Sequence, residues 1–116
     1  MKRIAALIAL IVMAQPILLQ EAAARPAKCV VLGNGMTPYR GTCNFMPDGG
    51  GSFAVEPIGK SGFDSVTMVS VTIMSPGVAQ VRGLTRDGIS SLWGEAKRSK
   101  TDPACWVGSD FKICVY

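Results

Sequence analysis

The chain has 116 residues, of which 48% are hydrophobic and only 17% are charged, and its formal net charge is +4. It contains no histidine, which excludes Ser-His-Asp and Cys-His nucleophile systems, imidazole acid–base catalysis and histidine metal ligands. The length allows one domain.

The N-terminal segment has the layout of a secretory signal peptide. Two basic residues precede an apolar run over residues 4–14, and Ala22 and Ala24 place small side chains at positions −3 and −1 of a cleavage site. The alternative is a membrane anchor, but a spanning helix needs about 20 apolar residues, and Gln15-Pro16 interrupts this run too early. We therefore expect cleavage after Ala24 and no membrane span in the mature protein.

Removal of residues 1–24 leaves a single domain over residues 25–116. Its 10 basic and 7 acidic side chains give a net charge of +3, which fits both solubility and a weak attraction to anionic surfaces. Because an exported protein rarely meets nucleic acid, we expect no nucleic-acid partner. We expect the domain to be periplasmic or secreted.

Turn-forming residues divide the mature chain into short β-rich runs. Glycine, proline, asparagine and aspartate cluster between runs of β-branched and aromatic residues, which is typical of strands joined by tight turns. The runs are 29–32, 42–46, 52–55, 64–74, 78–84, 89–93, 104–107 and 111–115. This pattern predicts an all-β fold, a small antiparallel barrel or sandwich of about six to eight short strands.

Two of these runs have irregular apolar patterns. The apolar face switches parity at Met68-Val69, which predicts a bulge or a bend between sheets. Residues 89–100 place Leu92 and Ala96 at a helix-like spacing, and Gly94 interrupts the pattern. For 89–100 we expect a short helical turn or an irregular loop.

Four cysteines in an exported chain of this size predict two disulfides. A two-residue turn at Ser109-Asp110 places Cys105 opposite Cys114 in a non-hydrogen-bonded pair, where side chains are closest. This pairing leaves Cys29 and Cys43 for the second bond. We therefore predict Cys105–Cys114 and, by elimination, Cys29–Cys43.

The second disulfide requires an adjustment of the first hairpin. An Asn-Gly turn at residues 34–35 predicts that Cys29 faces Arg40, three residues from Cys43. Either a bulge at Gly41 or a loop wider than two residues reduces this difference. A metal site is the alternative use of the cysteines, but the chain has no Cys-x-x-Cys pair. We expect no metal and no cofactor.

Three features resemble catalytic signatures but lack the required context. Residues 54–61 fit a loose phosphate-loop pattern, yet β-rich sequence follows where a helix should begin. Ser109 and Lys112 have a Ser-x-x-Lys spacing that aligns side chains on a helix, whereas here it spans a predicted turn. Nothing in the sequence brings two carboxylates together for glycoside hydrolysis. We expect no catalytic residue and no enzymatic activity. Of the three functional alternatives considered for this chain, a small secreted hydrolase is the least favoured.

The densest basic stretch is residues 97–100, and such a stretch is more often a solvated loop than a binding patch. Two arginines and a tryptophan precede this stretch. The region 82–100 as a whole is the candidate interaction surface. The leading expectation is an exported, non-enzymatic envelope or secreted interaction protein that binds an unidentified macromolecule, either a protein or an envelope component. Its candidate surface residues are Arg82, Arg86, Trp93, Lys97 and Arg98.

Three motifs together resemble a group of small exported bacterial proteins, mainly proteobacterial. They are Cys43-Asn44-Phe45, the turn Asp48-Gly49-Gly50-Gly51-Ser52-Phe53 and the tail from Cys105-Trp106 to Cys114. The resemblance implies a similar disulfide-bonded hairpin at each end of the domain and no known activity.

A more distant resemblance is to periplasmic lysozyme inhibitors of the c-type kind. The size, the expected export and the small β-barrel architecture are similar, but the chain lacks their Ser-Gly-rich segment before a Trp-x-Lys-Gly motif. Inhibition of a cell-wall hydrolase such as lysozyme is therefore the second functional expectation.

Overall fold

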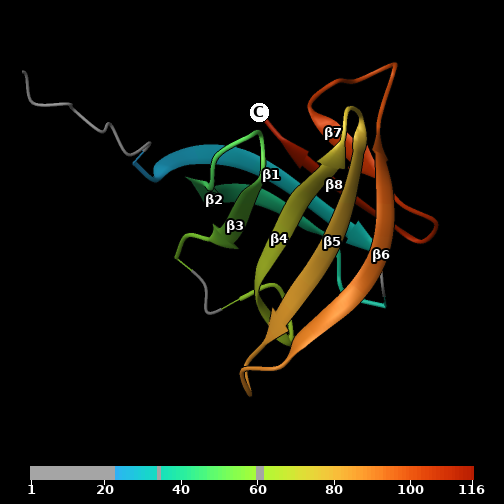
Figure 1. Cartoon of the computed structure of the whole chain (residues 1–116). Helices are drawn as coiled ribbons and strands as arrows, with labels where there is room; N and C mark the ends of the chain where they lie inside the picture. The colour runs from blue at the N-terminus through green and yellow to red at the C-terminus, as the bar shows by residue number, and fades with distance from the viewer. Residues whose placement is uncertain (1–22, 34, 60–61) are drawn as a thin grey trace, which may run out of the picture.

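A computed structural model describes residues 23–33, 35–59 and 62–116 of the chain (Figure 1). The strands are β1 (Arg25–Gly33), β2 (Tyr39–Pro47), β3 (Phe53–Pro57), β4 (Val66–Ser75), β5 (Val78–Thr85), β6 (Ser90–Arg98), β7 (Cys105–Val107) and β8 (Phe111–Val115). The prediction of an all-β domain is therefore confirmed. Almost all of the expected leader, residues 1–22, lies outside the described residues.

The strands form a closed barrel in which each strand pairs antiparallel with its neighbours in sequence (Figure 1). The last strand, β8, pairs with β1 and closes the ring, from Cys29 opposite Val115 to Gly33 opposite Phe111. Of the two predicted architectures, the structure is thus the barrel and not the sandwich. Within the described part of the chain, no helix is long and apolar enough to cross a membrane.

Alternating side chains fill the inside of the barrel. Away from the bulges in β4 and β6, each strand turns one parity inward, and these positions are mostly valine, isoleucine and aromatic residues, which suit a pleated, buried face. An eight-stranded barrel encloses a space that side chains just fill. The largest fully buried side chains of this core are Phe63, Ile113, Val31, Val55, Val69, Val71, Val81, Cys29 and Cys43.

A bulge in β4 explains the parity switch seen in the sequence. Val66 pairs with Thr85 while Met68 pairs with Leu84, so Thr67 is the extra residue. The predicted bulge is confirmed, one residue earlier than expected. It allows both Val66 and Val69 to be buried despite their spacing of three.

The expectation of a helical turn or loop over residues 89–100 is wrong, because Ser90–Arg98 forms strand β6. The strand contains a second bulge. Val81 pairs with Gly94 while Arg82 pairs with Leu92, which leaves Trp93 as the extra residue. Trp93 and Ala96 are buried, whereas Leu92, which the expected helical face included, is exposed.

The C-terminal disulfide is confirmed, together with the hairpin register from which it was predicted. Cys105 pairs with Cys114 across β7 and β8, and their Cα atoms are 4.0 Å apart. The neighbouring Trp106 and Ile113 point into the core. The Cys105–Cys114 bond therefore lies on the outer face of the barrel wall, where the contact between the Cys105 Sγ and the Tyr116 hydroxyl measures 3.6 Å.

The Cys29–Cys43 disulfide is also confirmed, and it lies inside the barrel. Cys29 pairs with Gly41 rather than with Arg40, and the pairing runs past Gly41 without a shift. The loop is therefore wider than the predicted two residues, and Gly41 forms no bulge. The bond joins diagonal neighbours, with a Cα–Cα distance of 5.8 Å.

Candidate functional site

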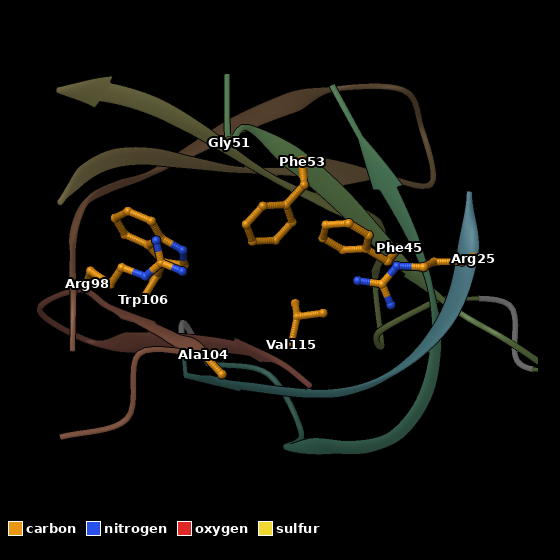
Figure 2. Close-up of a pocket in the computed structure, with 8 residues that line it drawn as sticks. All are labelled: Arg25, Phe45, Gly51, Phe53, Arg98, Ala104, Trp106 and Val115. Carbon is orange, nitrogen blue, oxygen red and sulfur yellow. The ribbon is translucent and has the colours of Figure 1, made fainter. Parts of the chain in front are cut away.

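A cavity of about 220 Å³ opens at one end of the barrel, where β1 and β3 begin and β2, β6 and β8 end (Figure 2). We call this end the mouth. The mouths of β-barrels are among the usual places for binding sites. The lining residues are Arg25, Phe45, Gly51, Phe53, Arg98, Ala104, Trp106 and Val115.

Arg25 forms one side of the mouth. It is the first residue of β1 and shares the inward parity of Cys29 and Val31, and it pairs with Phe45 of β2. Its guanidinium carbon lies 4.6 Å from the centre of the Phe45 ring. This cation–π stack covers one face of the guanidinium, so its N–H edges remain available for a ligand.

Arg98 forms the other side of the mouth. It is the last residue of β6 and pairs with Trp106 of β7. Its guanidinium carbon lies 5.2 Å from the Trp106 ring centre, and its Nε donates a hydrogen bond of 2.8 Å to the Pro103 carbonyl. Two independent contacts therefore orient Arg98, and its two terminal nitrogens remain for a ligand.

Apolar side chains lie between the two arginines. Figure 2 shows Phe53 and Val115 pointing into the space between the guanidinium groups. The Phe45 and Phe53 rings are 5.2 Å apart and form a continuous aromatic surface. Such a surface lowers the local dielectric and strengthens the attraction of the arginines for an anion.

The described residues that line the mouth include no carboxylate. Two positive charges therefore face one cavity from opposite sides without a lining side chain that neutralises them, which favours an anion or counterions at the mouth. Each guanidinium presents a planar set of donors that matches carboxylate and phosphate oxygens. The mouth is suited to hold an oxyanion.

The turn between β2 and β3 forms part of the rim. Its backbone is fixed by hydrogen bonds from the Asp48 amide to the Ser52 carbonyl and from the Ser52 amide to the Gly49 carbonyl. Gly51, which lines the mouth, has φ +90°, and a Cβ there would lie 3.4 Å from the Ile73 side chain. The positive φ favours glycine at this point of the rim.

A second network lies beside the mouth, in the loop between β6 and β7. The Tyr116 hydroxyl donates a hydrogen bond of 2.6 Å to Asp102. This bond, followed by one from the Ala104 amide, lowers the pKa of Asp102, and it raises the pKa of Tyr116. Asp102 is thus occupied by its own partners and does not line the mouth.

The opposite end of the barrel contains a different charged group, Asp64. Its carboxylate accepts a hydrogen bond of 2.8 Å from the Thr37 amide, and its carbonyl accepts one of 3.0 Å from Arg86. The Thr37 hydrogen bonds, with a smaller effect of the Arg86 charge, lower the pKa of Asp64. These contacts join the three loops that precede β2, β4 and β6, so we assign Asp64 and Arg86 a structural role.

The structure distributes the five expected surface residues over separate places. Arg98 lines the mouth, whereas Lys97 is exposed on the outer face of β6. Arg82 lies on the outer face of β5, because its neighbours on both sides point inward. Arg86 lies at the far end, and Trp93 is inside the barrel, 9% exposed and packed on Phe111. Only Arg98 of the five belongs to the cavity.

From the sequence, we did not identify Arg25, Phe45, Phe53 or Trp106 as site residues. A usable signal was the parity of the strands. Arg25 follows the inward parity of Cys29, and Arg98 follows that of the buried Ala96. A charged residue at an inward position at a strand end must lie at a barrel mouth.

Comparison of the chain with protein-family models, with curated proteins and with solved structures returns no match. The fold and the mouth define the chain as a small, disulfide-bonded, closed eight-stranded β-barrel.

Proposed function

We propose that this protein is an exported, non-enzymatic binding protein that holds an anionic group of its partner in the barrel mouth. One observation carries the proposal: Arg25 and Arg98, each stacked on an aromatic ring, line one cavity whose described lining has no carboxylate. The anion is a carboxylate or a phosphate, since these groups accept paired hydrogen bonds from guanidinium.

The compartment agrees with this proposal. Two disulfides indicate an oxidising, extracytoplasmic location. We propose more specifically that the protein is periplasmic or secreted after cleavage of its leader. Anionic groups of envelope components or of a protein partner would then be accessible to the mouth.

Mutation of Arg98 with a matched control tests the proposal. The probes are sodium sulfate, inorganic phosphate, acetate and benzoate. Their binding is measured from the NMR chemical shifts of the backbone amides and of the indole N–H groups. We expect shifts centred on Phe45, Phe53, Arg98 and Trp106. Arg98→Ala should weaken binding about tenfold or more, because hydrogen bonds to charged groups contribute about 1.5–3 kcal/mol.

Arg82→Ala is the control, since it removes the same charge from the outer face of the neighbouring strand. This variant should change the affinity less than twofold. Equal losses in both variants would indicate a general charge effect and contradict a site in the mouth. Shifts that spread over the barrel without a centre at the mouth would do the same.

Inhibition of a cell-wall hydrolase is the second candidate function. Glycoside hydrolases have paired carboxylates in their clefts, and these could serve as the anion for Arg25 and Arg98, which are exposed at the rim. The +3 charge of the mature chain disfavours steering toward a strongly basic lysozyme, which places this function second. Inhibition across a lysozyme panel at micromolar protein, lost in Arg98→Ala, would support it; no inhibition would exclude these enzymes as targets.

A further inference from the structure

We propose that removal of the leader completes the anion site, because cleavage after Ala24 creates an α-ammonium group on Arg25 at the mouth. The mouth of the mature protein then has three cationic groups and selects a doubly charged oxyanion, such as sulfate or a phosphate monoester, over a monocarboxylate. The inference rests on the proposed anion-binding function and on the expected cleavage site.

The position of Arg25 in the barrel carries the argument. β1 begins at Arg25, and this residue already pairs with Phe45 and lines the cavity. Ala23 and Ala24 are exposed and lie outside the strand. The expected cleavage site therefore coincides with the edge of the barrel, and the backbone nitrogen of a lining residue becomes the new N-terminus.

Cleavage changes the charge of this nitrogen. In the precursor it is an uncharged amide. Hydrolysis of the Ala24–Arg25 peptide bond by a signal peptidase adds one water molecule, leaving a carboxylate on Ala24 of the leader and an amino group on Arg25. The amino group has an ordinary pKa of about 7.7–8.0, so it is mainly protonated at pH 7.

The side chains that line the cavity beside the new group carry positive charge and no negative charge. Across the mouth lies Arg98 of β6, and the stretch of β2 beside Arg25, residues 44–47, has no ionisable side chain. The adjoining loops contribute Asp48, Lys100 and Asp102, none of which lines the cavity. Asp102 is hydrogen-bonded by Tyr116. A third cation therefore adds to the attraction for an oxyanion and increases it most for a dianion.

The composition of the chain makes the new group observable. There is no histidine, and all four cysteines form disulfides. The remaining side-chain types titrate well below pH 6 or near pH 10 and above. The α-ammonium is thus the expected source of any pH dependence between pH 6.5 and 9. Because the protonated form attracts the anion, affinity should be high at pH 6.5 and decrease through about pH 8.

Cys29 makes a controlled comparison possible. A synthetic peptide thioester of residues 25–28, with a free or an acetylated amino group, is joined by native chemical ligation to residues 29–116, and the product is oxidised and refolded. The two proteins differ by one charge. Disulfide mapping of each product verifies the Cys29–Cys43 and Cys105–Cys114 bonds before binding is measured.

Sulfate is the main probe, since it does not titrate in this range, and acetate is the monoanion for comparison. At pH 6.5 the free-amine protein should bind sulfate about fivefold more tightly than the acetylated protein, and the difference should disappear by pH 9.5. The difference for acetate should be smaller.

Equal sulfate affinities at pH 6.5 would overturn this inference, while the Arg98→Ala comparison would still decide the proposed function. Absence of anion binding by both proteins would overturn both. Mass spectrometry of the exported protein gives a separate test: a mature N-terminus at Arg25 supports the inference, and any other N-terminus overturns it.

Discussion

Gly83 is a buried position at which one methyl group should destabilise the barrel. It lies on β5, and a Cβ there would be 2.7 Å from Trp93 Nε1, 3.0 Å from Cε2 and 3.1 Å from Cζ2. All three contacts are with one indole, which is 9% exposed and has Phe111 as an aromatic neighbour, with ring centres 5.7 Å apart. The indole therefore has little space into which it can move.

Two effects of opposite sign determine the size of the change in Gly83→Ala. Gly83 does not have a positive φ, so alanine suits the strand and should gain about 0.5–1 kcal/mol over glycine. Overpacking of a filled core costs about 1–3 kcal/mol, and contacts at or below 3.1 Å with a confined ring favour the upper part of this range. We expect a net loss of about 2 kcal/mol in the free energy of unfolding.

A double-mutant cycle with Trp93→Leu isolates this contact. Urea unfolding is followed by circular dichroism in the wild type, in both single variants and in the double variant. In the Trp93→Leu background Gly83→Ala should be neutral or stabilising, which gives a coupling of about 2 kcal/mol. A Gly83→Ala variant as stable as the wild type, or a coupling below about 0.5 kcal/mol, would refute the reasoning.

Three further predictions concern the disulfide on the outer face and the two hydrogen-bonded aspartates. The double variant Cys105→Ala/Cys114→Ala should lose about 3 kcal/mol in urea unfolding, because the bond closes a short loop with a sequence separation of 9; a loss below about 1 kcal/mol would contradict this. The lowered pKa of Asp64 stabilises the fold above the unfolded pKa of about 4, and this stabilisation is lost as the pH decreases through the folded pKa. Asp64→Asn should therefore show a flatter profile of urea midpoints between pH 2 and 6, and a profile parallel to that of the wild type would be inconsistent with it. Tyr116→Phe removes the main hydrogen bond that lowers the pKa of Asp102, so NMR titration of that carboxyl should show a raised pKa, and an unchanged value would argue against the bond.

Local features of the chain could be predicted from sequence because their causes are local. The Ser109-Asp110 turn determined the register of β7 and β8, and the register brought Cys105 opposite Cys114. The parity switch before Val69 revealed the bulge in β4. In each case the turn or alternation lies within a few residues of the feature that it determines.

Features that depend on distant residues could not be predicted in the same way. The choice between barrel and sandwich depends on pairing between β1 and β8, the two ends of the domain. The mouth depends on the same closure, since it brings Arg25 and Val115 beside Trp106. The sequence does not separate the aromatic residues of the mouth from those of the core, because burial and ligand contact favour the same kinds of side chain, and only a position at a strand end distinguishes the mouth.

The pairing of β1 with β8 has a consequence for the order of assembly. β2 to β7 pair only with strands that are their neighbours in sequence, whereas one flank of β1 pairs with the last strand of the domain. The chain is synthesised from its N-terminus, so β1 appears long before β8. This flank of β1 therefore lacks its final partner until the last residues are made. Long-range pairing of this kind is slow, and an unpaired strand edge promotes aggregation. A chain without β8 would expose that edge and also lose the Val115 side of the mouth, so barrel closure and formation of the mouth are one event.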